Sequence, residues 1–335
     1  MNRTLFRRLV SLFSIFLLLF ASVLPAVGAR HPLSTLEHNR ATGVSDIDIT
    51  ISLDWDPDTV TNTAKVTRGM IKSEMETAVK EYAASLFAMT NGLHRLRNVY
   101  IFRDKKSWSS ADITYTGTKA GRSAANVAGW NQPNTQIDMF TYDYNAKTKE
   151  NEWDKYPGPV MAHETGHYIY GLMDEYRENG GKTIEELKEA KNLSTPSGED
   201  DNTQPSIMND HEVWQNWFSH AESYQGKPTG DAASKYDTAQ YRAYEKSIWD
   251  TLTSDPATDP AYARSYGRMQ YEAFKDKQVK TAKDLKAPRS GKLAGYDSVL
   301  NIVWVDAPVL NLVLLDSNIP SVKWQEAQAG AGSIA

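Results

Sequence analysis

The 335-residue sequence contains no cysteine. This absence excludes disulfide bonds, a cysteine nucleophile and any metal site built from thiolates. Metal ligands in this chain must therefore be histidine, aspartate or glutamate side chains. Stability must come from a hydrophobic core and from bound metal, and a chain of this length can bury a sizeable core.

The sequence also lacks a strong charge of either sign. Its 37 Lys and Arg residues against 42 Asp and Glu residues leave a formal net charge of -5. Nucleic acids and anionic membranes both favour a basic face, so neither is indicated as a partner. Glycine and proline are not in excess, while 17 Tyr and 9 Trp are typical of a folded protein.

Long hydrophobic runs are absent except at the N-terminus, where Leu9–Leu24 is apolar. Arg3, Arg7 and Arg8 precede this run, and small residues up to Ala29 follow it. This arrangement predicts a signal peptide over residues 1–29, and the alternative is an uncleaved N-terminal anchor. On the first interpretation, the mature protein is secreted, periplasmic or at the cell surface, and has no membrane span.

Hydrophobic periodicity after residue 30 predicts an α/β fold. Residues 30–45 are polar and are expected to be loosely held. Asp46–Asp54 alternates as a half-buried strand does, and Thr61–Met89 has apolar residues at helical spacing with Asn91 and Gly92 as its end. Further strands are predicted at Asn98–Arg103, Ala111–Tyr115 and Thr135–Phe140.

Two later regions have less regular patterns. Ser123–Trp130 is either an edge strand, which could bind an extended peptide by strand addition, or an irregular loop. His211–Lys277 is predicted to be mainly helical. Between the two, an acidic cluster could hold calcium or could be a solvated loop, and it comprises Glu199, Asp200 and Asp201.

The most informative stretch runs from Gly158 to Tyr176, where His163, Glu164 and His167 form the pattern H-E-x-x-H. Two histidines four positions apart on a helix can reach one zinc ion from one face. Glu164 lies beside that face, where it can act as the base toward water at the metal. The alternative is a chance spacing on a solvated helix.

A catalytic zinc site usually has three protein ligands, so a third is needed. One possibility is a glutamate from a later helix, with Glu185, Glu186 and Glu189 as the candidates. The other is a helix that ends at Gly171, where glycine can take the left-handed conformation, and a turn that brings Asp174 back to the metal. The second arrangement fits better, and Glu175 is a rival to Asp174 within it.

The segment HETGHYIYGLMDEY resembles the N-terminal metalloprotease domain of the calcium-activated chloride channel regulator (CLCA) family, which is metzincin-like. The resemblance implies that His163, His167 and Asp174 are zinc ligands and that Glu164 is the catalytic base. It also implies that Met208 is the methionine of a turn beneath the metal, although a methionine is more often a simple core residue. A metzincin-like zinc protease domain with a mixed sheet is therefore expected over residues 30–295.

The same resemblance gives an interpretation of residues 296–335. CLCA proteins carry a von Willebrand factor A domain after the protease, and Leu310–Pro320 resembles its first strand and metal motif, with Asp316 present but Asn318 and Pro320 in place of two serines. Residues 296–335 are then a truncated start of that domain. The alternative is that Val299–Val305 and Val309–Leu315 are the last two strands of the protease domain, followed by a tail.

The function predicted from these features is that of a secreted zinc endopeptidase that acts on a protein or peptide substrate. Two alternatives remain at this point. One is a non-catalytic surface or adhesion module with a structural zinc site. The other is a protease that cuts only itself.

Overall fold

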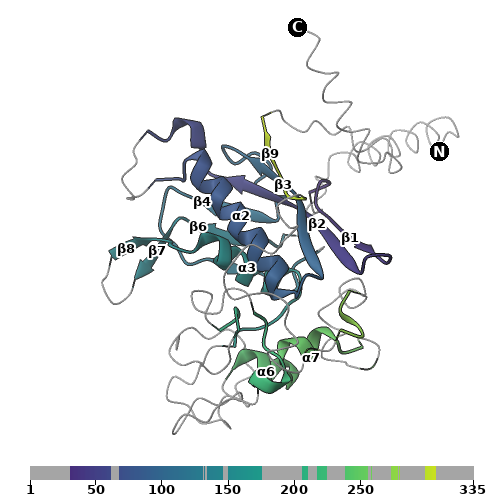
Figure 1. Cartoon of the computed structure of the whole chain (residues 1–335). Coiled ribbons are helices and arrows are strands. Elements are labelled where there is room, and N and C mark those ends of the chain that lie inside the picture. The colour runs from purple at the N-terminus through teal and green to yellow at the C-terminus, as the bar shows by residue number, and fades with distance from the viewer. Residues whose placement is uncertain are drawn as a thin grey trace, which may run out of the picture. The chain divides into compact units, whose positions relative to one another are not determined.

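A mixed β-sheet with two long helices packed against it forms the centre of the computed structural model, which confirms the α/β class (Figure 1). The seven-stranded sheet has the order β5-β6-β4-β2-β3-β9, and β1 pairs with β2 beside this path. The pairs β2–β3, β2–β4 and β4–β6 are parallel, whereas β1–β2 and β5–β6 are antiparallel. Its strands are β1 (Thr35–Asn39), β2 (Val44–Leu53), β3 (His94–Phe102), β4 (Ile113–Thr116), β5 (Ala124–Ala125), β6 (Ile137–Phe140) and β9 (Asn301–Val305).

The structure describes residues 31–61, 68–130, 132, 134–145, 150–175, 206–209, 217–224, 238–255, 258, 273–277, 279 and 299–306. The chain divides into one unit of residues 1–304 and a second of residues 305–335. Several predicted features lie outside the described residues: the signal peptide 1–29, the glutamates 185, 186 and 189, the acidic cluster 199–201 and the segment 310–320. Within the described residues, no helix has the length and apolarity required to span a membrane.

Strand β2 is the central strand, and it is buried along almost its whole length rather than half-buried as predicted. The alternating polar residues misled the prediction because their side chains are bonded inside the protein. The Thr50 amide and hydroxyl both donate to Oδ2 of Asp112, at 2.9 and 2.7 Å. Because these polar groups are hydrogen-bonded to one another, their burial costs little free energy.

The expectation that residues 30–45 are loosely held was wrong. His31 and Ser34 are only 4% and 1% exposed. The His31 amide donates to the carbonyl of Ser110 at 3.0 Å, and the Ser34 hydroxyl donates to Asp112. The polar composition of this segment was visible in the sequence, but its buried partners, some 78 positions away, were not.

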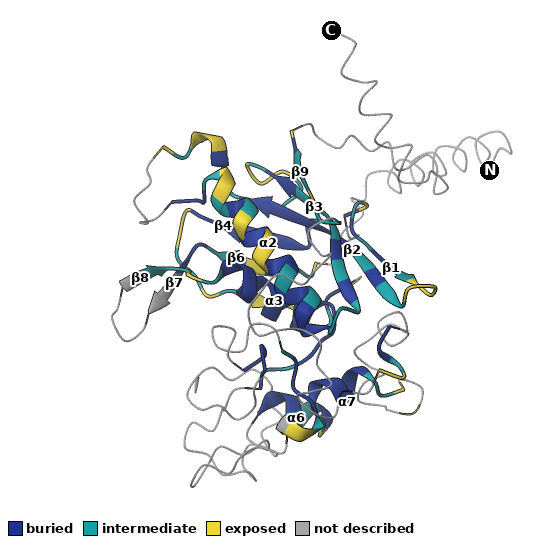
Figure 2. Cartoon of the chain, in the orientation of Figure 1, coloured by how far each residue is buried: buried dark blue, intermediate teal, exposed yellow. Residues whose placement is uncertain are grey.

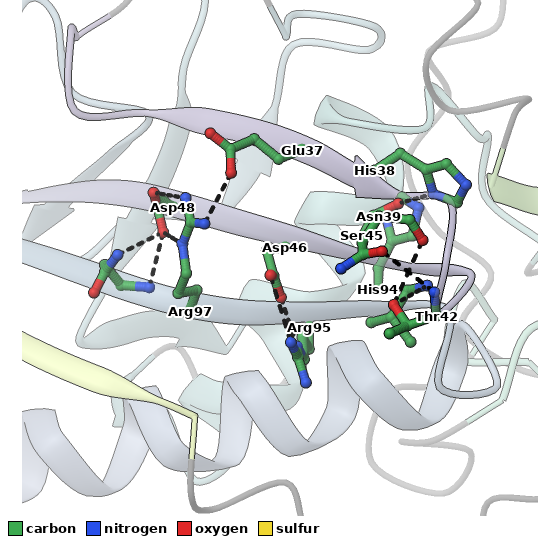
Figure 3. Close-up of polar contacts among 12 residues, drawn as sticks. Glu37, His38, Asn39, Thr42, Ser45, Asp46, Asp48, His94, Arg95 and Arg97 are labelled. Carbon is green, nitrogen blue, oxygen red and sulfur yellow. Dashed lines mark hydrogen bonds and ion pairs between the residues drawn. The ribbon is translucent and has the colours of Figure 1, made fainter. Parts of the chain in front are cut away.

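Ion pairs connect β1, β2 and β3 on the sheet (Figure 3). Arg97 on β3 donates from Nε and Nη2 to the two oxygens of Asp48 at 2.9 and 2.6 Å, and from Nη1 to Glu37 on β1 at 2.9 Å. Arg95 pairs with Asp46, two residues before Arg97 and Asp48 on the same two strands. The Asp48 side chain is only 7% exposed, so these hydrogen bonds also compensate for its burial.

Helix α2 (Lys72–Met89) begins later than the predicted start at Thr61. The chain just before it is not helical, because the amide of Arg68 is bonded to the Tyr142 hydroxyl at 2.7 Å and Gly69 lies against the Trp55 ring. The predicted end is confirmed. Asn91 and Gly92 both follow the helix with positive φ, at 52° and 78°.

Helix α3 (Pro157–Tyr168) carries the H-E-x-x-H motif and is buried at all twelve positions (Figure 2). It packs against α2 and against β5 and β6. A side chain at Gly158 would overlap the backbone of α2, and the hydroxyls of Tyr82 and Thr165 are hydrogen-bonded at 2.7 Å. The alternative of a solvated helix is therefore wrong, and the motif lies in a buried, closely packed part of the fold.

The remaining described elements are short. A hairpin outside the main sheet consists of β7 (Tyr142–Asn145) and β8 (Glu150–Trp153). The region predicted to be mainly helical contains the helices α5 (Ala221–Tyr224), α6 (Ala239–Tyr244) and α7 (Ile248–Leu252). The predicted strand Val299–Val305 corresponds to β9, which lies next to β3 in the main sheet.

Candidate metal centre

His163 and His167 on α3 and Asp174 beyond its end form a group that could hold a metal ion. The Nε2 atoms of the two histidines are 3.2 Å apart. Oδ1 of Asp174 is 3.3 Å from His163 Nε2 and 3.2 Å from His167 Nε2. The three ligand atoms thus form a nearly equilateral triangle, and this is the only such group among the described residues.

The size of this triangle fits a tetrahedral metal site. Zinc bonds to nitrogen and carboxylate oxygen are about 2.0–2.1 Å long, so two ligands of a tetrahedral ion lie about 3.3–3.4 Å apart. The observed separations of 3.2 and 3.3 Å match that value closely. Three protein ligands leave the fourth tetrahedral position open, which is the arrangement of catalytic rather than structural zinc sites.

Backbone carbonyls orient both histidine rings. Nδ1 of His163 lies 2.8 Å from the carbonyl oxygen of Ile207, and Nδ1 of His167 lies 2.7 Å from that of Leu172. Each Nδ1 can donate its proton to that carbonyl, which leaves the lone pair of Nε2 directed at the candidate metal position. These two hydrogen bonds select the tautomer that a metal ligand requires.

The helix ends as the sequence predicted, and the turn that follows brings Asp174 back. Gly171 has φ of 54°, in the left-handed region that glycine adopts without strain. Its amide donates to the carbonyl of His167 at 2.7 Å, and the Leu172 amide donates to that of Gly166 at 3.0 Å. The bond from Gly171 to the carbonyl four positions earlier is that of the αL type of helix end, and the turn brings the chain back toward the histidines.

Glu175, the rival of Asp174, points in another direction. Its Oε1 accepts a hydrogen bond from the Ser219 hydroxyl at 2.6 Å, and its amide donates to the carbonyl of Met208 at 2.9 Å. Burial raises the pKa of Glu175 to about 7, against the lowering effect of hydrogen bonds from Ser206 and Ser219. Glu175 therefore joins the turn at residues 206–209 to the segment at residue 219.

Glu164 is buried beside the group, only 6% exposed. Its Oε2 has no hydrogen-bond partner among the described residues. A buried carboxylate oxygen without a partner is costly in a stable fold, and this one can still accept a hydrogen bond from a ligand. Burial raises the pKa of the Glu164 carboxyl above its usual value, although His163 and His167 partly oppose this.

Met208 lies directly against α3 at Gly166, a residue that falls between His163 and His167 in the sequence. It is wholly buried, and a Cβ atom at Gly166 would overlap its sulfur. The side chain therefore packs against the helix that carries the candidate ligands, as a core residue does. The role in a turn beneath the metal, which the family resemblance implies, stays a prediction.

The electrostatics of the group favour positive charge between its ligand atoms. Burial by itself would lower the pKa of His167, but the charge and hydrogen bond of Asp174, with smaller effects from Glu164 and the Leu172 carbonyl, together raise it to about 9. Burial likewise opposes ionisation of Asp174, yet His167 and His163 hold the pKa of that carboxyl well below its usual range. A divalent cation would supply the positive charge that this carboxylate stabilises.

The predicted edge strand is present, but only at Ala124–Ala125, where β5 pairs with β6 at the end of the sheet. The chain that follows β5 is bonded to the end of α3. The amides of Ala128 and Trp130 donate to the carbonyls of His167 and Tyr168 at 2.8 and 3.0 Å. These bonds hold the edge of the sheet next to the helix that carries the candidate ligands.

Several residues of the site had not been singled out from the sequence. A glycine inside a helix, such as Gly166, is itself a signal of close packing and could have been noticed. The carbonyls of Ile207 and Leu172 and the side chain of Ser219 carry no local signal, because any residue has a carbonyl group and serine is common at surfaces.

Comparisons with protein-family models, with curated proteins and with solved structures return no match to this chain. The fold and the site therefore define the class: an α/β protein with a mixed sheet and a buried His, His, Asp group that could hold a metal ion.

Proposed function

We propose that this protein is a zinc-dependent endopeptidase with a metzincin-like fold. The observation that carries the proposal is the triangle of ligand atoms from His163, His167 and Asp174, of tetrahedral size, with the unpartnered carboxylate oxygen of Glu164 beside it. A structural zinc site would use four protein ligands and would need no buried carboxylate next to it. The resemblance of HETGHYIYGLMDEY to the CLCA protease domain points to the same chemistry.

Three features support the metzincin-like part of the proposal. An antiparallel strand forms the sheet edge next to the metal helix, the helix ends at a glycine before the third ligand, and Met208 packs beneath Gly166. Residues 1–29 support export of the protein, to the cell surface, the periplasm or the medium. The start of a von Willebrand factor A domain over residues 296–335 stays a prediction.

In the proposed reaction, side chains of the protein bind the metal and transfer the proton. When bound, zinc supplies a Lewis acid that polarises the scissile carbonyl and lowers the pKa of a water toward about 7. The two imidazoles and the Asp174 carboxylate hold the ion. The Glu164 carboxylate accepts a proton from the attacking water and then donates it to the nitrogen of the leaving amine.

Substrate would lie along the edge of the sheet. The outer edge of β5 offers backbone groups to an extended peptide, which binds by adding a strand. Val127 follows β5 and is 40% exposed, the only large hydrophobic residue in the described part of the chain with such exposure. An extended protein segment with an apolar side chain is therefore the expected kind of substrate.

The test is to replace Glu164 with Gln and to measure zinc content and hydrolysis of a mixed peptide library. The variant should keep zinc and lose about 10²–10⁴-fold in hydrolysis. Glu81→Gln is a matched control, because it makes the same change at an exposed position on α2. Undiminished hydrolysis by Glu164→Gln would refute the proposed role.

The same assay separates the two alternatives. A structural or adhesion module would bind zinc and hydrolyse nothing, with or without a chelator. A protease restricted to itself would show self-cleavage that a chelator stops, while every library peptide stays intact. The proposed endopeptidase cleaves library peptides in a chelator-sensitive manner.

A further inference from the structure

Helix α6 holds the turn that carries Asp174, although the two are far apart in the chain. The amide of Met173 donates to Oε1 of Gln240 at 3.0 Å, across 67 positions of sequence. The amide of Gln240 donates to the carbonyl of Asp174, also at 3.0 Å. One residue of α6 therefore bonds the backbone on both sides of the peptide unit that joins Met173 to Asp174.

Gln240 is itself held in one orientation. It is wholly buried, and its Nε2 donates to the Thr251 hydroxyl on α7 at 3.0 Å. Because the amide nitrogen is engaged there, Oε1 is the end that faces Met173. The Thr238 hydroxyl caps α6 by accepting from the Tyr241 amide at 3.1 Å, and the Tyr244 hydroxyl donates to the carbonyl of Gly171 at 2.9 Å.

The third ligand needs such support more than the other two do. His163 and His167 belong to one buried helix, whose backbone is fixed by its own hydrogen bonds. Residues 171–175 belong to no helix or strand. Oδ1 of Asp174 nevertheless lies 3.2–3.3 Å from both imidazoles, so its backbone must be fixed by contacts from elsewhere.

We propose that α6 is a clamp for the third metal ligand and that Gln240 is its positioning residue, which sets the place of Asp174 through the two backbone hydrogen bonds. The proposal rests on the metal-binding part of the proposed function and not on proteolysis. It predicts that the metal affinity of the group depends on a side chain that touches neither the metal nor its ligands' side chains.

A buried glutamine that only stabilised the fold would behave differently. Its loss would lower the free energy of unfolding without changing the affinity of the folded protein for metal. Ser247→Ala provides this comparison, since Ser247 caps α7 by accepting from the Asp250 amide at 3.1 Å and has no hydrogen bond to residues 171–175. Loss of such a cap destabilises a helix but leaves the Asp174 turn in place.

The experiment measures the zinc dissociation constant of the full chain by competition with a chromophoric chelator, and the unfolding midpoint of the zinc-free protein in urea. Gln240→Met keeps the length of the side chain and removes the side-chain amide, which accepts the hydrogen bond from Met173. We expect it to weaken zinc binding by about 10–100-fold, as loss of a group that orients a ligand does. Ser247→Ala should lower the unfolding midpoint and leave the zinc affinity unchanged.

Tyr244→Phe is a milder second variant that keeps the ring and removes one hydrogen bond to the same turn. It should weaken zinc binding by about two- to tenfold. Wild-type zinc affinity in both Gln240→Met and Tyr244→Phe would overturn the clamp, and so would an equal loss of affinity in Ser247→Ala. If the wild-type protein bound no zinc, the proposed function and this inference would fall together.

Discussion

Met208 packs against Gly166, and the contact is so close that a methyl group on Gly166 would overlap the methionine sulfur. The two residues come from different parts of the chain, the turn at residues 206–209 and the last turn of α3. The contact places the turn against the helix that carries His163 and His167. It also allows the Ile207 carbonyl to lie 2.8 Å from Nδ1 of His163.

Gly166→Ala should therefore destabilise the protein, although alanine is the better helix former. In an ordinary helix interior the change would stabilise by about 1 kcal/mol. Here the overlap with Met208 should instead cost about 1–3 kcal/mol, the usual penalty of overpacking. Urea unfolding of the zinc-free protein measures the difference without a contribution from metal binding.

The double variant Gly166→Ala/Met208→Ala is the control for this contact. It removes the methionine that the new methyl group would overlap, so the two substitutions should couple and the effect of Gly166→Ala should turn favourable. Higher stability in the single variant Gly166→Ala would contradict the close contact.

Asp174→Asn should weaken metal binding, whereas Glu175→Gln should not. Asp174→Asn removes the carboxylate charge from the triangle of ligand atoms, and the zinc affinity should fall by more than the roughly 100-fold that loss of an orienting group costs. Glu175→Gln should leave the affinity unchanged, because Glu175 is bonded to Ser219. Metal analysis after dialysis, with competition titration, decides between them; the reverse order would make Glu175 the ligand.

The stability of the protein should fall as the pH drops below about 6.5, in part because of His94. This residue is wholly buried against Phe274, with Nδ1 2.8 Å from the Tyr170 hydroxyl. Burial, with a smaller effect from His38, lowers the pKa of His94 from 6.5 to about 3. Between these values the unfolded chain binds a proton that the folded protein excludes, so acid favours unfolding.

The variant His94→Asn, whose amide can replace Nδ1, tests this effect. From about pH 7 to about pH 5, the wild type should lose about 2 kcal/mol more unfolding free energy than the variant, at about 1.4 kcal/mol per unit of pKa difference. Both proteins are measured in chelator, which removes bound metal. The histidines that the two proteins share contribute equally, so their effect cancels in the difference. Equal losses would show that His94 is protonated in the folded state.

Asp112→Asn should destabilise the protein by about 1–3 kcal/mol, because a neutral amide replaces a buried carboxylate whose Oδ2 alone accepts three hydrogen bonds. Those bonds come from the Ser34 hydroxyl and from the amide and hydroxyl of Thr50. Ser34→Ala removes only one of them and should cost less. Thermal unfolding of both variants measures the order, and an unchanged Ser34→Ala protein would mean that the N-terminal segment is not anchored there.

Local patterns predicted the α/β class, most strand positions, the end of α2 and the end of α3. Each of these depends on residues close in sequence, such as Asn91 and Gly92, which take positive φ where a helix stops. The errors have the opposite origin. The segment at His31–Asn39 and the burial of β2 depend on Asp112 and on strand pairing, which are distant in sequence.

By itself, the sequence determined which side chains could serve as ligands and base, since the absence of cysteine and the spacing of His163, Glu164 and His167 restrict the chemistry. Only the tertiary structure decided between Asp174 and Glu175 as the residue beside the histidines, because the direction of a side chain after a turn depends on backbone bonds to α6 and to Met208. Those bonds join residues tens of positions apart. They are made by the amide groups of one glutamine and by a backbone carbonyl, and no local sequence pattern predicts where such groups will lie.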